Sequence, residues 1–258
     1  MARMLTGFAE VAGTALGGAF SLLRRIRHPR PIHPRGLVLT GQMTWVSDAA
    51  PSGLGWIDEP GAPVEVTARL SRGVGLPDRL PDVLGLALRF HTADGRHADV
   101  LLASTGIGFP SRFLLVPRRS GTGATFSSLM PYRAPQGPVL ICARSVPRRV
   151  LPADLAGLRR SLRDEPWRLR LYHATPTGTW HPFAEALLRH AGEPDSDELR
   201  FQPTVHPIPG GTTYPWLRRL REPSYRAVQR DTRIPAVRDA HEREHVGDGE
   251  TSGGERQR

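Results

Sequence analysis

Arg221 and Tyr225 are spaced so that one side chain can change the chemistry of the other. Positions four residues apart share one face of a helix, so a guanidinium and a phenol at this spacing can touch. A free tyrosine has a pKa of about 10 and binds metals poorly while protonated, but a permanently charged arginine beside it favours the phenolate. A phenolate is a hard anionic donor that suits ferric iron, including the iron of haem. The pair is therefore either part of an iron site or an ordinary exposed pair on a helix.

Five short segments follow one another along the chain: 30–36 (RPIHPRG), 66–71 (VTARLS), 81–90 (PDVLGLALRF), 99–101 (DVL) and 221–225 (REPSY). They resemble, in the same order, the catalase motifs R-x-x-H-x-[KR]-G, V-x-R-F-S, D-V-R-G-F-A-x-K-F, D-L-V and R-L-F-S-Y. Across residues 30–233 the chain is therefore similar to catalase-fold haem proteins.

This resemblance implies an α+β fold, with an antiparallel β-barrel of catalase type and flanking helices. Because 258 residues are far fewer than a full catalase has, we expect a minimal version without the long wrapping loop and the C-terminal helical domain. The expected organisation is an N-terminal amphipathic helix or arm at 1–29, a haem-binding barrel domain at 30–235 and a disordered polar tail at 236–258.

The resemblance also assigns roles to individual residues. Tyr225 is the expected metal ligand, binding the iron of haem b, and Arg221 keeps its phenolate ionised. His33 is the expected acid–base residue for peroxide cleavage, and Ser71 is expected to hydrogen-bond its far nitrogen. The remaining residues expected to contact the cofactor are Arg30 and Arg69 at the propionates, Phe109 and Phe113 against the porphyrin, and Gln229 beyond the tyrosine.

Two departures from the catalase pattern bear on the reaction. Catalases place a peroxide-orienting asparagine after D-L-V, whereas residues 102–105 read LAST, which leaves Ser104 as the candidate replacement. Pro223 lies between Arg221 and Tyr225 in the arginine–tyrosine motif, and because proline is tolerated only in a helix's first turn, the helix must begin near it. We therefore expect a peroxidase that uses hydrogen peroxide or organic hydroperoxides and an organic electron donor, rather than a fast catalase.

Local patterns agree with a β-rich domain. Residues 64–70 alternate as a half-buried strand does, and strands are also expected at 37–46, 113–116, 139–146 and 167–174. The Asp94–Gly95 pair between 85–90 and 99–103 is a hairpin signal. Residues 153–163 are typical of a short helix.

Charge and cysteine content limit the partners. The net charge of +10 comes from arginine alone, but the arginines are scattered and no nucleic-acid module is present, so no specific nucleic-acid partner is expected. Cys142 stands alone in an apolar strand, which indicates a buried thiol and a reducing, cytoplasmic location. For residues 5–23 three readings stay open: a helix packed on the barrel, a peripheral membrane contact, or a homodimer contact.

Each residue also has an ordinary structural reading. His33 can be a loop histidine, Arg69 a solvent-facing arginine, Ser71 a strand-end cap, and the two phenylalanines plain core. Two other function classes therefore remain: a catalase-fold haem-binding protein with little turnover, and a haem-free module that binds membrane surfaces or nucleic acid.

Overall fold

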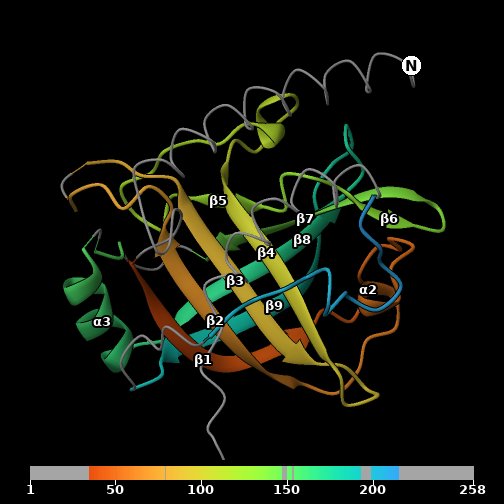
Figure 1. Ribbon diagram of the computed structural model, residues 1–258. Coiled ribbons are helices and arrows are strands. Elements are labelled where there is room, and N and C mark those ends of the chain that lie inside the picture. The colour runs from red at the N-terminus through yellow and green to blue at the C-terminus, as the bar shows by residue number, and fades with distance from the viewer. Residues whose placement is uncertain (1–34, 79, 147–149, 153, 193–198, 215–258) are drawn as a thin grey trace, which may run out of the picture.

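The computed structural model describes residues 35–78, 80–146, 150–152, 154–192 and 199–214, so the expected arm at 1–29 and tail at 236–258 lie outside the described residues. Within the described part the elements follow one another as seen in Figure 1. In chain order they are β1 (Arg35–Trp45), α2 (Gly55–Asp58), β2 (Val64–Arg72), β3 (Leu84–His91), β4 (His97–Thr105), the 3-10 helix η1 (Ser111–Phe113), β5 (Thr125–Ser127), β6 (Tyr132–Ala134), β7 (Gly137–Ser145), α3 (Leu155–Asp164), β8 (Trp167–Ala174) and β9 (His181–His190).

Eight of the described strands close into an antiparallel barrel in the order β5-β4-β3-β2-β1-β9-β8-β7, and β5 pairs with β7 to complete the ring. The short β6 pairs only with the start of β7. Closure leaves no long unpaired strand edge among these eight strands. The expectation of a closed antiparallel barrel with a few flanking helices is confirmed.

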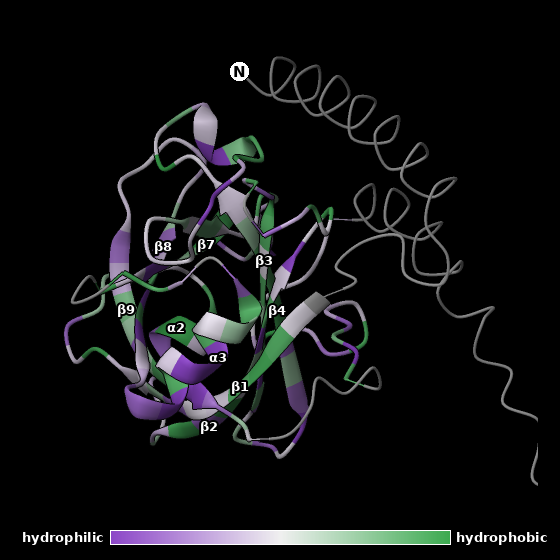
Figure 2. Cartoon of the chain, turned by 90° about the vertical axis from the view of Figure 1, so that its left-hand side faces the viewer, coloured by the Kyte–Doolittle hydropathy of each residue, from purple (hydrophilic) through white to green (hydrophobic). Residues whose placement is uncertain are grey.

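Alternation along the strands decides which side chains face the barrel interior. In β2, Val66, Ala68 and Leu70 are buried, while the residues between them are only partly covered. In Figure 2, hydrophilic and hydrophobic residues accordingly follow one another along the strands. The β3–β4 hairpin turns where the sequence predicts it, and Gly95 adopts a left-handed φ of 76° there, which glycine tolerates without strain.

The interior is filled by inward side chains of the strands, and a helix closes each end. Leu158 and Leu162 of α3 join the core at one end, and Trp56 and Ile57 of α2 join it at the other. Figure 2 looks along the barrel from the α3 side, with both helices inside the ring of strands. Each buried leucine stabilises the fold by about 1.5–3 kcal/mol.

Local expectations differ from the structure in two places. The strand expected at 113–116 is wrong: Ser111–Phe113 form η1, and only Leu115 makes an isolated bridge, to Thr105. Flanking prolines at 110 and 117 explain this, because proline cannot donate to a strand ladder. β9 was not expected, since its Ala-, Glu- and Leu-rich sequence favours helix locally and is a strand here because β1 and β8 pair with it on both sides.

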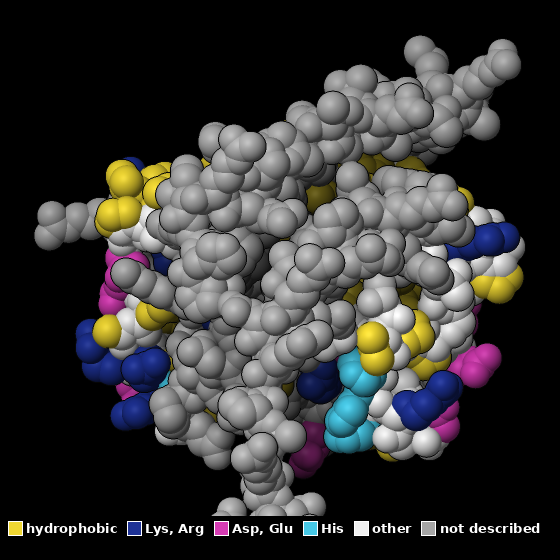
Figure 3. Space-filling view, in the orientation of Figure 1, with side chains coloured by type: hydrophobic (Ala, Val, Ile, Leu, Met, Phe, Trp, Pro, Cys, Tyr) yellow, Lys and Arg dark blue, Asp and Glu magenta, His cyan; other side chains and the backbone are white. Residues whose placement is uncertain are grey.

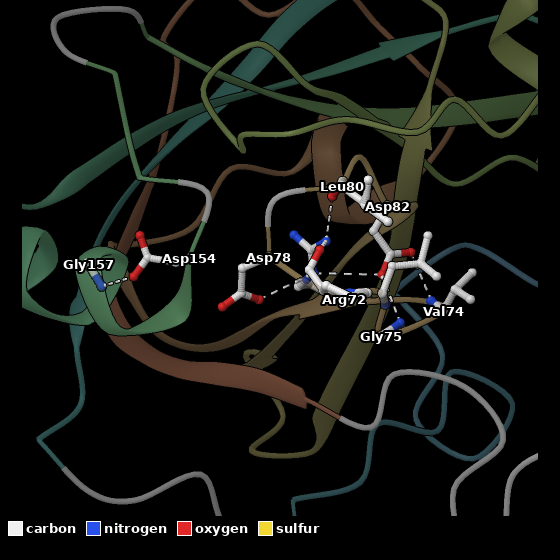
Figure 4. Close-up of polar contacts among 10 residues, drawn as sticks. Arg72, Val74, Gly75, Asp78, Leu80, Asp82, Asp154 and Gly157 are labelled. Atoms are coloured by element: carbon white, nitrogen blue, oxygen red, sulfur yellow. Dashed lines mark hydrogen bonds and ion pairs between the residues drawn. The ribbon is translucent and has the colours of Figure 1, made fainter.

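The helix expected at 153–163 is α3, and it begins as the sequence suggests. Asp154 caps it by accepting a 2.6 Å hydrogen bond from the Gly157 amide, a contact drawn in Figure 4. Such a cap typically stabilises a helix by about 1 kcal/mol. Neither helix in the described ranges has the length and apolar character that crossing a membrane requires.

Candidate functional site

Strand register brings a patch of small side chains together on the outside of β1–β4. Residues directly opposite each other in an antiparallel sheet lie on the same face. Two neighbouring rows cross the four strands on the side that faces away from the barrel core, and we call these eight residues the outer platform. They are Gly36, Ser71, Gly85 and Ala103 in the first row, and Val38, Arg69, Ala87 and Leu101 in the second.

Apart from Arg69, the outer platform carries nothing larger than a leucine. Four strands at their usual spacing make it about 14 Å wide, and two rows lie about 7 Å apart. A sheet face of glycine, alanine and serine lets a flat ligand approach the backbone closely. The platform is therefore a suitable surface for a planar molecule.

Arg69 lies flat against the platform rather than standing away from it. A Cβ atom added to Gly36 would lie 2.6 Å from Arg69 Cζ and 2.8 Å from one of its terminal nitrogens. The guanidinium therefore occupies space that any residue other than glycine would fill. This arrangement places a permanent positive charge at the start of β1, on the first row of the platform.

Ser71 lies on the same face as Arg69, two residues further along β2. Its side chain is buried, and its hydroxyl donates a 3.3 Å hydrogen bond to the Gly85 carbonyl across the sheet. The structure thus brings two of the expected site residues together on the outer platform. His33, the expected partner of Ser71, lies outside the described residues.

Ser104 does not join them. It alternates with Ala103 and so belongs to the inward face of β4, where it is completely buried. Its hydroxyl accepts a hydrogen bond from the Leu84 amide at 2.9 Å and donates one to the Val116 carbonyl at 2.8 Å. These bonds tie the end of β4 to the start of β3 and to the following loop. The Ser104 hydroxyl therefore has a structural role inside the barrel and lies on the opposite face of β4 from the platform.

Phe109 and Phe113 lie in the loop that follows β4. Phe109 is 60% exposed, and the two rings meet edge to face with centroids 6.4 Å apart. Arg112 between them points the other way: it is buried, donates to the Thr175 and Gly178 carbonyls, and lies 4.7 Å from the Trp180 ring. A buried arginine thus fixes this loop beside the turn between β8 and β9.

The other expected residues, namely Arg30, His33, Arg221, Tyr225 and Gln229, lie outside the described residues. In the part of the chain that the structure describes, no three His, Cys, Asp or Glu side chains are grouped to hold a metal ion. Cys142 is buried on β7, and burial raises the pKa of its thiol to about 12, so it is not a nucleophile.

Sequence reasoning missed a segment that crosses the outside of β3 and β4. Residues 199–206, which we call the strap, pass in front of these strands in Figure 1. Asp99 accepts a 2.6 Å hydrogen bond from the Gln202 amide and donates its own amide to the His206 carbonyl at 2.9 Å. These contacts join residues more than one hundred positions apart, so no local pattern signals them.

Histidines gather where the strap ends, and Figure 3 shows them side by side on this face. The His97 ring lies 4.4 Å from that of His91 and 5.9 Å from that of His206. Loss of water from around the ring, followed by the nearby charges of His91 and Arg89, lowers the pKa of the largely exposed His97. An open groove of about 740 Å³ begins here and runs along the outside of β9, β1, β2 and β3.

A buried ion pair supports the loop that joins β2 to β3. Asp82 accepts hydrogen bonds from three successive amides, those of Val74, Gly75 and Leu76, and lies 3.7 Å from Arg72 Nε (Figure 4). Arg72 in turn donates to the Leu80 carbonyl at 2.7 Å. Because this loop connects Ser71 to Gly85, the pair helps to fix the first row of the platform.

Comparison with known proteins supports the fold alone. No family model and no curated protein sequence matches the chain. Among solved structures, a bacterial catalase resembles it with a TM-score of 0.50 and 14% sequence identity, over 93% of this chain and 67% of that one. The barrel is therefore of the catalase type, with few helices.

Proposed function

We propose that the chain is a haem-dependent peroxidase that binds haem b against the outer platform. The observation that carries this proposal is the platform itself: on a barrel of catalase type, two rows of small outward side chains lie beside a guanidinium held over Gly36. A flat apolar surface with a fixed cation at one edge suits a planar macrocycle that bears carboxylates.

The residues present fit such a group. Apart from Arg69, no side chain of the platform is larger than leucine, so a flat ring can approach the sheet beside the arginine. Arg69 presents a planar fork of donors, which matches a propionate better than a lysine would. Arg30, five residues before β1, is the second proposed propionate partner. Phe109 and Phe113, in the loop after Ala103, would cover the ring edge with apolar surface.

Haem would supply the redox chemistry of peroxide cleavage, and Tyr225 would bind its iron as a phenolate kept ionised by Arg221. Neutral His33 would take a proton from one peroxide oxygen and return it to the other, so that water leaves. Ser71, fixed on the platform, would set the tautomer of His33 through its far nitrogen.

A peroxidatic reaction is favoured over a catalatic one because the platform lacks an orienting amide. Beyond Asp99, the residues of β4 on the outward side are Leu101, Ala103 and Thr105. Neither Leu101 nor Ala103 can donate a hydrogen bond from its side chain, and the buried Thr105 hydroxyl already donates to the Gly106 carbonyl at 2.9 Å. Ser104 faces inward and is fully engaged. A lost orienting donor costs a few kcal/mol of transition-state stabilisation, whereas oxidation of an organic donor at the ring edge does not require it.

The absorption spectrum of protein produced with haem supplied tests the proposal. We expect a Soret band of the high-spin ferric, tyrosinate-ligated kind, and its loss or strong weakening in Tyr225→Phe. Tyr214→Phe is the matched control and should keep the band. A colourless wild-type protein, or a Tyr225→Phe variant with the wild-type spectrum, would contradict the assignment. Peroxide-dependent oxidation of a phenolic dye should exceed oxygen release under matched conditions.

A further inference from the structure

The strap borders the outer platform, and one ion pair holds it there. Arg89 and Asp99 face outward from β3 and β4, two residues beyond Ala87 and Leu101 of the platform's second row. Two residues along a strand span about 7 Å. The strap, which contacts both residues, therefore lies along that edge of the platform.

The pair is bidentate and its acid is completely buried. Arg89 Nε and one terminal nitrogen donate to the two Asp99 oxygens, each at 2.7 Å, and the side chains are 20% and 0% exposed. Burying a carboxylate is costly unless strong hydrogen bonds offset the lost hydration. Here the Gln202 amide adds a third bond to Asp99, and this bond comes from the strap itself.

Each partner of the pair contacts the strap separately. The terminal nitrogen of Arg89 that reaches Asp99 also donates to the Arg200 carbonyl at 2.6 Å, and the guanidinium lies 5.2 Å from the Phe201 ring centre. Asp99 binds the strap through its carboxylate and through its backbone amide. The pair thus contacts both the backbone and an aromatic side chain of the strap.

Barrel closure does not require this arrangement. β3 and β4 pair along seven positions by backbone hydrogen bonds, and the strap adds no strand to the sheet. A second outward ion pair, Arg170 with Glu185, joins β8 to β9 in the same way but is more exposed, with side chains 43% and 29% exposed. The buried pair of Arg89 and Asp99 therefore does more than join two strands, since it also binds the strap.

We propose that Arg89 and Asp99 are positioning residues that hold the strap as one wall of the planar-ligand site. This inference rests on the proposed function, because the proposed haem is the ligand that the wall would enclose. The strap also leads directly into residues 207–214 and so to the chain that carries Arg221 and Tyr225. Fixing its path therefore limits where that chain can begin.

The test compares Asp99→Asn with Asp94→Asn. Both remove one charge from an Arg–Asp pair of the same hairpin, but the pair of Asp94 and Arg96 is at the turn, with side chains 51% and 82% exposed. Hydrogen exchange of the haem-free proteins reports the strap directly. We expect amides of 199–206 to exchange about tenfold faster in Asp99→Asn and at the wild-type rate in Asp94→Asn.

Haem titration then separates a positioning role from a merely structural one. We expect Asp99→Asn to bind haem roughly 10- to 100-fold more weakly, the range seen when a residue that orients a ligand is lost, with an altered Soret maximum and an unchanged far-UV spectrum. Arg89→Lys should behave similarly, because lysine cannot make the bidentate contact. Asp99→Glu should restore part of the affinity.

The outcomes are distinguishable. Faster strap exchange with wild-type haem affinity and spectrum would overturn the positioning role. Unchanged strap exchange in Asp99→Asn would overturn the claim that the pair holds the strap. A wild-type protein that takes up no haem would refute the proposed function and the wall's ligand with it, while the exchange result on its own would still establish what fastens the strap.

Discussion

Replacing Gly36 by alanine should separate cofactor binding from stability. The new Cβ would lie 2.6 Å from Arg69 Cζ, and no real Cβ contact is that short. The clashing atoms are at the far end of a long, flexible side chain, so Arg69 can move away without disturbing the sheet. The substitution should therefore displace the guanidinium and leave the barrel intact.

The two expected effects have opposite signs. A hydrogen bond to a charged group contributes about 1.5–3 kcal/mol, so losing the Arg69–propionate contact should weaken haem binding by about 10- to 150-fold. The haem-free protein should be as stable as the wild type or up to about 1 kcal/mol more stable, because alanine restricts the unfolded chain more than glycine does. Haem titration and urea unfolding measure the two quantities.

Two other glycines serve as controls. A Cβ at Gly61 meets nothing within 4 Å, so Gly61→Ala should keep the wild-type haem affinity and show the same gain in stability of up to about 1 kcal/mol. A Cβ at Gly41 would lie 1.9 Å from the Leu187 carbonyl oxygen, so Gly41→Ala should destabilise the barrel itself. Wild-type haem affinity in Gly36→Ala would refute the role of Arg69. A loss of stability equal to that of Gly41→Ala would refute the idea that only the arginine moves.

Three further outcomes are expected. His33→Ala should keep the Soret band and lose roughly two to four orders of magnitude in the rate of peroxide cleavage in stopped-flow measurements; equal rates would remove His33 from the mechanism. Ser104→Ala should lower the free energy of unfolding by about 1–3 kcal/mol, because two backbone groups lose their partner, while dye oxidation stays at the wild-type rate; a selective loss of rate would restore Ser104 to the site. Burial is the main cause that lowers the pKa of His173, so the unfolded state binds more protons and stability should fall as the pH drops below about 6.5; urea midpoints that are flat between pH 7.5 and 5 would contradict this.

Much of the barrel could be predicted because its strands carry their own signals. β2 alternates between buried and partly covered residues, and the Asp94–Gly95 turn fixes the β3–β4 hairpin. Arg69 and Ser71 could be placed on one face for the same reason, since they are two residues apart on an alternating strand.

The placement of Ser104 could not be predicted in this way. Residues 100–103 are apolar on both sides of β4, so the sequence does not indicate which set faces inward. Only the pairing of Gly85 with Ala103 places Ser104 on the interior face. The position of the strap was even less predictable, because the contact between Asp99 and Gln202 spans 103 positions and produces no periodic pattern in the sequence.

Because the platform faces outward, the two sides of each strand have different roles: one side packs the core and the other faces the proposed ligand. Leu86 and Leu88 of β3 fill the barrel, while Gly85 and Ala87, which alternate with them, face the proposed ligand. A substitution on the outward face therefore changes ligand binding with little effect on core packing, and one on the inward face does the reverse. Binding specificity and stability can thus evolve independently along a single strand such as β3. The outward residues of the platform could therefore be redesigned for a different planar ligand while the inward residues of the core are kept unchanged.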